Sequence, residues 1–453
     1  MKYFFETYGC QMNSAESAAL VLACRERGWE EAPDGESADL VLINTCSVRA
    51  TAEQRALGRI ALYASLKKKR LEKGQNFALV IAGCMAQRMG DDLQEKYPAV
   101  DYLMGTAGRS LFPLILEAVE KNIDDGNFPE IKPDEEPQFS FSPSHLEEAE
   151  NQSPVRSFVP IMHGCNNYCS YCIVPYLRGR EVSRDPEFIL EEIRQVGQRG
   201  VKEITLLGQN VNSYNWNKGE VKFARLLQKA GEEAEKSGVK WIRFLSVNPA
   251  NFSQETIAVM AENKVFCRHL HLCVQHGSNR ILAKMNRGYN REYYLKLIAD
   301  IRRVMPDISF STDILVGFPG EKEEDFAEIL TLMEEVKFLY AYMYHFNPRE
   351  GTAAYKFTGR ISEEIKRERL NKVINLQKEH TAALLQKRLG QKEKVLIEGV
   401  SRKNAGELIG RTERDEMVVV PGDISMIGSF ANVTLSTLKG HTLWAKEFIQ
   451  EEL

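Results

Sequence analysis

The sequence predicts an α/β protein with three parts: an N-terminal doubly wound parallel α/β domain, a central partial (βα)6 barrel and a C-terminal small antiparallel β-barrel. Two observations support this prediction. Two long stretches of the chain alternate apolar, strand-like runs with helical patterns, which is typical of parallel sheets covered by helices. The C-terminal stretch instead holds short β-rich runs separated by Gly, Asn or Asp, which indicates a small barrel of the OB type.

The N-terminal stretch contains three predicted strand runs, of which the second and third have the continuous apolar composition of buried parallel strands. They span residues 2–10, 40–43 and 77–81, with helical patterns at 14–27 and 51–72 and shorter strand and helix signals at 102–104 and 111–119. Cys10, Cys46 and Cys84 lie at the C-terminal ends of these runs, the edge where an open α/β sheet binds ligands. A single cysteine is commonly a small core residue. Three cysteines at equivalent positions after three predicted strands indicate an iron–sulfur cluster site in which one iron has no protein ligand.

The central stretch repeats the strand–helix alternation six times. Strand signals lie at residues 158–162, 203–207, 242–246, 269–274, 308–315 and 340–345, and helical patterns at 186–198, 222–236, 253–262, 280–304, 323–336 and 362–389. Six units are too few to close an eight-stranded barrel, so we expect an open, partial barrel whose active face is formed by the C-terminal ends of the strands. The short runs of the terminal barrel lie at 394–399, 408–411, 417–420, 430–435 and 443–445.

A loop directly after the first central strand carries Cys165, Cys169 and Cys172 with the spacing Cx3Cx2C. Three thiolates on one short loop are able to bind three irons of a cubane [4Fe–4S] cluster and leave the fourth iron open to a small molecule. The alternative is a zinc knuckle, which needs a fourth Cys or His at short range. His163 is available for that role, but no second CxxC follows.

Composition narrows the class of protein. Nine cysteines among 453 residues without a secretory signal favour a reducing cytosol and metal or redox chemistry over a disulfide scaffold. No apolar run reaches the roughly 18 residues of a membrane span, so we expect no signal peptide and no membrane anchor. With a net charge of −4, nucleic-acid binding would depend on local basic patches.

Seven stretches carry a resemblance to a known family. They are residues 7–13, 44–49, 82–84, 164–175, 178–184, 207–212 and 313–321. Over essentially the whole chain, the sequence resembles the radical S-adenosylmethionine (SAM) methylthiotransferases, MiaB type. The resemblance implies a methylthiotransferase domain at 1–125, a linker at 126–153 that is rich in Pro, Glu, Asp and Ser, a radical SAM core at 154–380 and an RNA-binding TRAM domain at 381–453.

The resemblance also implies the reaction: transfer of a methylthio group to C2 of N6-isopentenyladenosine at tRNA position 37, with two [4Fe–4S] clusters and two SAM molecules. Cys165, Cys169 and Cys172 would bind the SAM-cleaving cluster. An auxiliary cluster carrying the sulfur would be bound by Cys10, Cys46 and Cys84. One SAM would methylate sulfur on the auxiliary cluster. The radical from a second SAM would activate the C2–H bond of the nucleoside, so that the sulfur is inserted there.

For SAM itself, the resemblance implies that residues after a predicted strand, Gly208, Gln209 and Asn210, take up the amino group. Tyr171 would hold the adenine through its backbone, and Gly317 is a further SAM contact. No catalytic residue is assigned beyond the cluster ligands. Four positions depart from the family pattern: His276 where Ser is usual, Cys273 where Pro is common, Asn248 where His is frequent, and Ala353 in place of Pro.

The expected partners are the tRNA anticodon stem-loop that carries isopentenyladenosine and a reducing electron-donor protein. We expect a cytoplasmic monomer. Phosphate contacts are predicted in the basic stretch 49–73, for which a solvated helix face is an equal alternative. In the terminal barrel they would come from basic side chains, which are Lys387, Arg388, Arg402, Lys403 and Arg411.

Two alternatives stay open. A methylthiotransferase of this type could act on a ribosomal-protein aspartate or on threonylcarbamoyladenosine in tRNA; the stretch 208–212 resembles the isopentenyladenosine branch and weighs against both. A non-catalytic RNA-binding iron–sulfur protein that senses redox state is disfavoured, because the Cx3Cx2C loop leaves one iron open.

Overall fold

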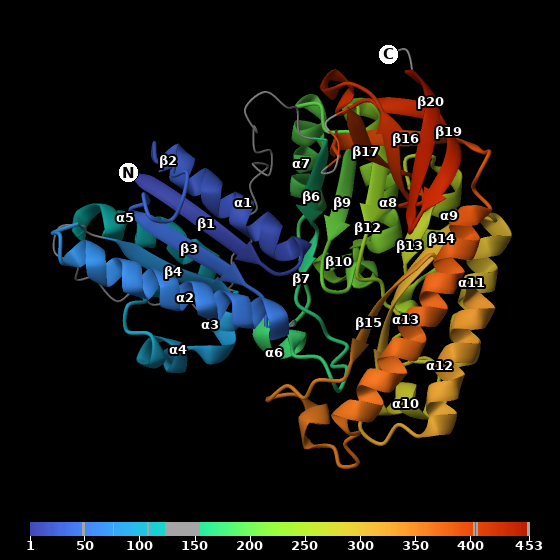
Figure 1. The fold of residues 1–453 in the computed structure, drawn as a ribbon, viewed down its shortest axis with the longest axis horizontal. Coiled ribbons are helices and arrows are strands. Elements are labelled where there is room, and N and C mark those ends of the chain that lie inside the picture. The colour runs from blue at the N-terminus through green and yellow to red at the C-terminus, as the bar shows by residue number, and fades with distance from the viewer. Residues whose placement is uncertain are drawn as a thin grey trace. The chain divides into compact units, whose positions relative to one another are not determined.

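The computed structural model describes residues 1–47, 50–75, 77–106, 108–122, 155–401, 404 and 406–450 (Figure 1). The chain forms two compact units, Met1–Glu147 with Val174–Arg180, and Glu148–Ile173 with Glu181–Leu453. The linker predicted at residues 126–153 lies outside the described residues. Within the described ranges, no helix has both the length and the apolar character that a membrane crossing requires.

The first unit contains a five-stranded parallel sheet in the order β2-β1-β3-β4-β5. The strands are β1 (Lys2–Tyr8), β2 (Glu30–Glu31), β3 (Leu40–Thr45), β4 (Ala78–Gly83) and β5 (Tyr102–Met104). The helices are α1 (Gln11–Glu26), α2 (Ala50–Leu71), α3 (Cys84–Met89), α4 (Asp91–Lys96), α5 (Phe112–Asn122) and α6 (Val174–Arg178). This sheet confirms the predicted doubly wound arrangement.

Strand β3 shows why the sheet carries helices on both faces. Its side chains alternate, so that Leu40 and Leu42 pack in one apolar cluster with residues of α1 and α5. Val41 and Ile43 pack in the other cluster with residues of α2 and α3. All six residues of the strand are buried, as expected for a central parallel strand. The strand order reverses direction between β1 and β3, the place where doubly wound sheets bind ligands.

The second unit contains the six predicted strands, all parallel and in sequential order. They are β6 (Arg156–Pro160), β9 (Glu203–Leu207), β12 (Trp241–Phe244), β13 (His269–His271), β14 (Ser309–Val316) and β15 (Tyr340–His345). Single parallel bridges, Ile242 with Phe266 and Val247 with Leu272, join the two three-stranded halves. Among the described residues β6 and β15 do not pair, so the predicted open barrel is confirmed.

Helices cover this partial barrel: α7 (Pro186–Gln198), α8 (Phe223–Ser237), α9 (Gln254–Glu262), α10 (Asn279–Lys284), α11 (Arg291–Val304), α12 (Glu323–Val336) and α13 (Glu363–Gln386). The prediction of one helix over 280–304 is wrong. Asn286 and Gly288 have φ values of 58° and 71°, and left-handed residues end a right-handed helix. Asn290 then accepts a hydrogen bond from the Tyr293 N–H and begins α11 as its N-cap.

Short two-stranded pieces complete the unit, namely β7 (Met162–His163) with β8 (Val182–Ser183) and β10 (Asn215–Trp216) with β11 (Val221–Lys222). The C-terminal residues form the predicted closed barrel, ordered β16-β17-β18-β20-β19. Its strands are β16 (Lys392–Val400), β17 (Glu407–Thr412), β18 (Met417–Pro421), β19 (Phe430–Lys439) and β20 (Thr442–Gln450). Four pairings are antiparallel, whereas β18 pairs with β20 in parallel.

The terminal barrel packs against the N-terminal ends of the central strands. The Trp241 and Phe430 rings meet edge to face at 4.8 Å between centroids. Arg243 donates to the carbonyl oxygen of Thr412 at 2.9 Å, and the Ser309 hydroxyl donates to a carbonyl of the terminal barrel at 3.0 Å. The carboxyl ends of the central strands, where sites form in barrels, are therefore left to the loops that carry the predicted site residues.

Candidate cluster and cofactor sites

The first unit brings Cys10, Cys46 and Cys84 together. Cys10 precedes α1 after β1, Cys46 follows β3, and Cys84 begins α3 after β4, so three neighbouring strands deliver one cysteine each. The thiols of Cys10 and Cys84 each interact with the thiol of Cys46. Their role as metal ligands stays a prediction, and a set of three adjacent thiols has the chemistry that a cluster needs.

Two glycines permit this close approach. Gly83 has a φ of 90°, and a Cβ there would lie 2.5 Å from Asn44 Oδ1 and 2.6 Å from a backbone carbonyl oxygen. A Cβ on Gly9 would lie 2.9 Å from the Cβ of Cys46. Asn13 and Asn44 connect the segments that carry Cys10 and Cys46. The Asn13 side-chain NH2 donates to Asn44 Oδ1 at 3.0 Å, and Asn13 Oδ1 accepts from the Cys10 thiol at 3.2 Å.

Arg178 of α6 supplies a positive charge to the three thiols. It forms a buried ion pair with Glu16 of α1, with 2.6 Å between Nη1 and Oε1 and both side chains 4% exposed. The hydrogen bond with Cys46, together with Arg178, lowers the pKa of Cys10 to about 6 and that of Cys84 to about 7. The hydrogen bonds with Cys10 and Cys84, together with burial, raise the pKa of Cys46. Because metals bind the thiolate form, this environment prepares two of the three cysteines as ligands.

The second unit carries Cys165, Cys169 and Cys172 on the loop after β7. Cys165 and Cys169 are buried and Cys172 is half-buried. Burial raises the pKa of Cys165 to about 11. Ser170, between two of the cysteines, donates through its backbone N–H to the Met285 carbonyl at 3.0 Å and through its hydroxyl to the Lys284 carbonyl at 2.8 Å. The end of α10 therefore holds the loop in place.

The break between α10 and α11 places Arg287 beside this loop, a residue that sequence reasoning missed. Its Nη1 lies 3.1 Å from the sulfur of Cys169, and its Nη2 donates to the Cys273 carbonyl at 2.8 Å. Its Nε donates to the hydroxyl of Tyr289 at 2.9 Å. A guanidinium in this position brings a positive charge into contact with one of the three predicted cluster ligands. The signal that could have revealed it is the pair of turn-forming residues on either side, Asn286 and Gly288.

The predicted SAM residues lie near the Cx3Cx2C loop. Gln209 accepts a hydrogen bond from the Gly164 N–H at 2.6 Å, and Asn210 donates to Glu181 at 2.9 Å. A Cβ on Gly208 would lie 2.6 Å from Cγ of Met162, so glycine allows the strand end to approach β7. These contacts place the stretch beside the loop, and SAM binding by it stays a prediction.

The two other predicted SAM residues lie in the same unit. The hydroxyl of Tyr171 lies 3.5 Å from Nη1 of Arg287. Gly317, directly after β14, has a φ of 70°, and a Cβ there would lie 2.2 Å from Cγ of Lys366. Gly317 is thus required by the backbone and by packing, whether or not it contacts SAM.

The departures from the family pattern have structural partners. His276 is fully buried, lies 3.2 Å from Glu321 Oε2 and accepts from the Ser278 N–H at 2.9 Å. Asn248 caps a short turn by accepting from the Ala250 N–H. Ala353 begins a one-turn helix, Ala353–Lys356. Cys273 lies 3.2 Å from the Nε2 atom of His271.

Several basic side chains predicted to contact phosphate form ion pairs within the protein instead. Arg388 is buried against Glu393 and Glu416, and Arg411 pairs with three carboxylates, those of Glu203, Glu398 and Asp415. In α2, Arg59 pairs with Glu6 and the buried Lys67 pairs with Asp101. Lys68, Lys69 and Lys73 are exposed, whereas Arg49, Arg402 and Lys403 lie outside the described residues. Arg388 and Arg411 therefore stabilise the terminal barrel and its junction with the core.

Three family models match the chain. The Radical SAM superfamily model matches residues 159–333, and the model of the uncharacterized protein family UPF0004 matches residues 2–105. The TRAM domain model matches residues 386–446. Both three-cysteine sets lie inside the matched segments, and so does the terminal barrel up to residue 446 of β20.

Curated relatives align over nearly the full length. A tRNA-2-methylthio-N(6)-dimethylallyladenosine synthase of Treponema denticola is 46% identical over 458 residues, which cover 98% of this chain and 99% of the relative. The protein of the same name from Treponema pallidum (strain Nichols) is 46% identical, with 100% and 99% covered. That of Syntrophus aciditrophicus is 40% identical, with 99% and 95% covered.

Solved structures share the fold at low sequence identity. The radical S-adenosylmethionine methyltransferase TsrM from Kitasatospora setae, with cobalamin and a [4Fe-4S] cluster bound, aligns with a TM-score of 0.54 and 15% identity over 76% of this chain and 72% of that chain. The cobalamin-dependent S-adenosylmethionine radical enzyme OxsB aligns with a TM-score of 0.52 and 12% identity. The alignment covers 83% of this chain and 56% of OxsB. At these identities the likeness supports the fold alone.

Proposed function

The chain belongs to the radical SAM tRNA methylthiotransferases, in the family of tRNA-2-methylthio-N(6)-dimethylallyladenosine synthases, and we propose that it transfers a methylthio group to C2 of N6-isopentenyladenosine at tRNA position 37. The observation that carries this proposal is the pair of separate three-cysteine sets in a chain that matches these synthases from end to end. Each set lies after strands of a parallel sheet or barrel, one in each compact unit.

The two sets have different roles in this proposal. Cys165, Cys169 and Cys172 hold the [4Fe–4S] cluster that binds SAM, and Cys10, Cys46 and Cys84 hold the auxiliary [4Fe–4S] cluster. When bound, the clusters supply the reductive cleavage of SAM and the sulfur that is transferred.

The chain's own residues prepare these sites. Arg178 holds positive charge beside the auxiliary cysteines, and Glu16 fixes its position. Arg287 contacts the sulfur of Cys169 and holds a positive charge beside that ligand. Gln209 fixes the backbone at the start of the Cx3Cx2C loop and, with Gly208, Asn210, Tyr171 and Gly317, forms the SAM contacts.

We also propose the domain roles and the partners. Residues 1–125 carry the auxiliary site, residues 154–380 form the radical SAM core, and residues 381–453 bind RNA. The protein acts in the cytoplasm as a monomer on the tRNA anticodon stem-loop and receives electrons from a reducing donor protein.

Substitution of each cysteine set tests the division of roles. Replacing Cys10, Cys46 and Cys84 with Ala should abolish sulfur insertion and leave reductive SAM cleavage, because the SAM site lies in the other unit. Replacing Cys165, Cys169 and Cys172 should abolish both activities. The assay combines anaerobic protein, SAM, dithionite and isopentenylated tRNA, and measures 5′-deoxyadenosine and digested nucleosides by mass spectrometry.

The matched control is Cys24→Ala, since Cys24 is a buried core cysteine outside both sets. It should retain both activities. Loss of SAM cleavage in the first variant, in folded protein that keeps iron at the second set, would contradict separate roles. Formation of methylthiolated nucleoside by either triple variant would contradict the assignment of that set.

A further inference from the structure

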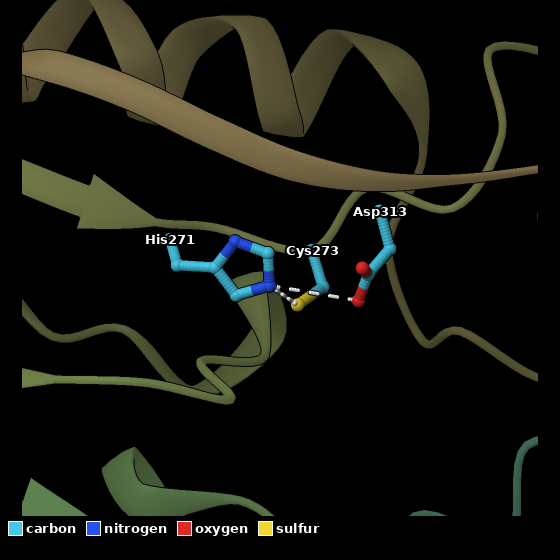
Figure 2. Close-up of side chains that lie close together, drawn as sticks. All are labelled: His271, Cys273 and Asp313. Carbon is cyan, nitrogen blue, oxygen red and sulfur yellow. Dashed lines mark hydrogen bonds and ion pairs between the residues drawn. The ribbon is translucent and has the colours of Figure 1, made fainter. Parts of the chain in front are cut away.

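Three ligand-type side chains outside both cysteine sets lie close together in the second unit, as Figure 2 shows. They are His271 of β13, Cys273 just beyond it and Asp313 of β14. The Nε2 atom of His271 lies 3.2 Å from Cys273 Sγ and 3.6 Å from Asp313 Oδ2. One ligand atom from each residue lies within 4.8 Å of the other two.

Strand pairing explains this convergence. β13 and β14 are parallel neighbours, with His271 opposite Ser311. Cys273 is two residues after His271, and Asp313 is two residues after Ser311, so all four side chains project to the same side of the extended backbone. The sheet register therefore builds the group, and no rearrangement of a loop is needed to assemble it.

The spacing suits a metal ion. Zinc bonds of about 2.0–2.2 Å to N and O and about 2.3 Å to S, at tetrahedral angles, separate neighbouring ligand atoms by roughly 3.3–3.6 Å. The observed separations are 3.2 Å for the N···S pair and 3.6 Å for the N···O pair, and all three ligand atoms lie within 4.8 Å of one another. The two measured pairs lie within about 0.4 Å of the tetrahedral values. Imidazole with thiolate suits Zn²⁺ better than the hard cations Mg²⁺ and Ca²⁺, which prefer oxygen ligands alone.

The surrounding residues orient His271 and hold the backbone of Cys273. Ser311 Oγ lies 3.0 Å from Nδ1 of His271, which leaves Nε2 to face the site, as in zinc sites whose histidines are held through the second ring nitrogen. Arg287 and Tyr289 both donate to the carbonyl oxygen of Cys273, at 2.8 and 3.0 Å. His271 and Cys273 are 8% and 9% exposed, so water competes little for these positions.

The charges also balance. A dication with one thiolate, one carboxylate and a neutral imidazole is neutral overall.

We propose that His271, Cys273 and Asp313 form a Zn²⁺ site with three protein ligands and a fourth position for water or for a nitrogen or oxygen donor of the substrate. Three protein ligands with an open position are typical of catalytic rather than structural zinc. The site is separate from both cysteine sets. Arg287 lies between it and the Cx3Cx2C loop, because the same guanidinium contacts Cys169 and the Cys273 carbonyl.

The test uses the full-length protein reconstituted with its iron–sulfur clusters, incubated with ZnSO4 and passed through a desalting column. Elemental analysis should give one zinc per chain. Zinc K-edge absorption, which is blind to iron, should report one sulfur at about 2.3 Å and nitrogen or oxygen neighbours at about 2.0–2.2 Å. Cys273→Ala and Asp313→Asn should each weaken zinc binding at least tenfold.

The matched control is Cys267→Ala, because Cys267 is buried in the same unit but packs among apolar side chains. It should bind zinc like the unsubstituted protein. Circular dichroism and iron content identify any variant that fails to fold, and Asp313→Asn preserves the shape of the side chain. Absence of retained zinc would overturn the proposal, as would zinc surrounded by three or four sulfurs and unaffected by Cys273→Ala. Zinc binding is measured without tRNA, so it stands or falls independently of methylthio transfer.

Discussion

The substitution Arg178→Met tests the buried ion pair beside the auxiliary cysteines. Arg178 and Glu16 are each 4% exposed at the side chain, and they form two contacts, at 2.6 and 3.3 Å. Removing one partner of a buried ion pair leaves an uncompensated charge and typically costs about 3–5 kcal/mol. We therefore expect Arg178→Met to destabilise the first unit by about that amount.

Hydrogen exchange measured by mass spectrometry is the assay, because it reports on α1 and α3 separately from the second unit. A loss of about 3–5 kcal/mol corresponds to roughly 100- to 5,000-fold faster exchange of amides that open with the unit. The double variant Glu16→Gln with Arg178→Met removes the buried charge, so it should regain at least about 1 kcal/mol.

Two results would refute this reasoning. The first is a change of less than about 1 kcal/mol in the single variant, which is the magnitude of an exposed ion pair. The second is a double variant as unstable as Arg178→Met, since that would place the loss in packing of the side-chain stem and not in the charge.

Three further predictions concern single residues. Gly83→Ala should destabilise the first unit by about 2 kcal/mol or more in thermal unfolding, because its φ is 90° and the new Cβ would lie 2.6 Å from a backbone oxygen; a neutral effect would contradict the close packing. Asp325→Asn should cost about 1–2 kcal/mol equally at pH 6 and pH 8. Although burial opposes it, Arg280 lowers the pKa of Asp325 from 3.8 to about 2. The contribution of Asp325 to stability is therefore complete above pH 3.8 and is lost as the pH falls from there through about 2. A deficit that differs between pH 6 and pH 8 would contradict this. Arg287→Met should slow SAM cleavage at least tenfold with iron content retained, since it removes the contact with Cys169; an unchanged rate would exclude a role for that contact.

Much of the fold was predictable because the buried strands are short, continuous apolar runs. β5 has the predicted bounds, and β3 and β4 differ from the prediction by only a few residues. The grouping of Cys10, Cys46 and Cys84 was predictable because parallel strands end at a common edge. β2 was missed, because Glu30 and Glu31 carry no strand pattern.

Other features depend on contacts between distant residues. Residues 174–180 cluster with the first unit, and Arg178 pairs with Glu16, which is 162 positions away in the sequence. The position of Arg287 depends on the break between α10 and α11, and the apolar pattern over residues 280–304 predicted one continuous helix. The convergence of His271, Cys273 and Asp313 depends on the register between two strands, which a single sequence does not specify.

The measurement that tests the central claim most directly is a competition among substrates. Reconstituted protein, SAM and dithionite are combined anaerobically with isopentenylated tRNA, tRNA carrying threonylcarbamoyladenosine and the ribosomal-protein substrate, and the products are digested and analysed by mass spectrometry. We predict 2-methylthio-N6-isopentenyladenosine as the sole methylthiolated product. Methylthiolation of either competitor in its place would contradict the proposed substrate, and uncleaved SAM in protein that holds both clusters would contradict the radical enzyme itself.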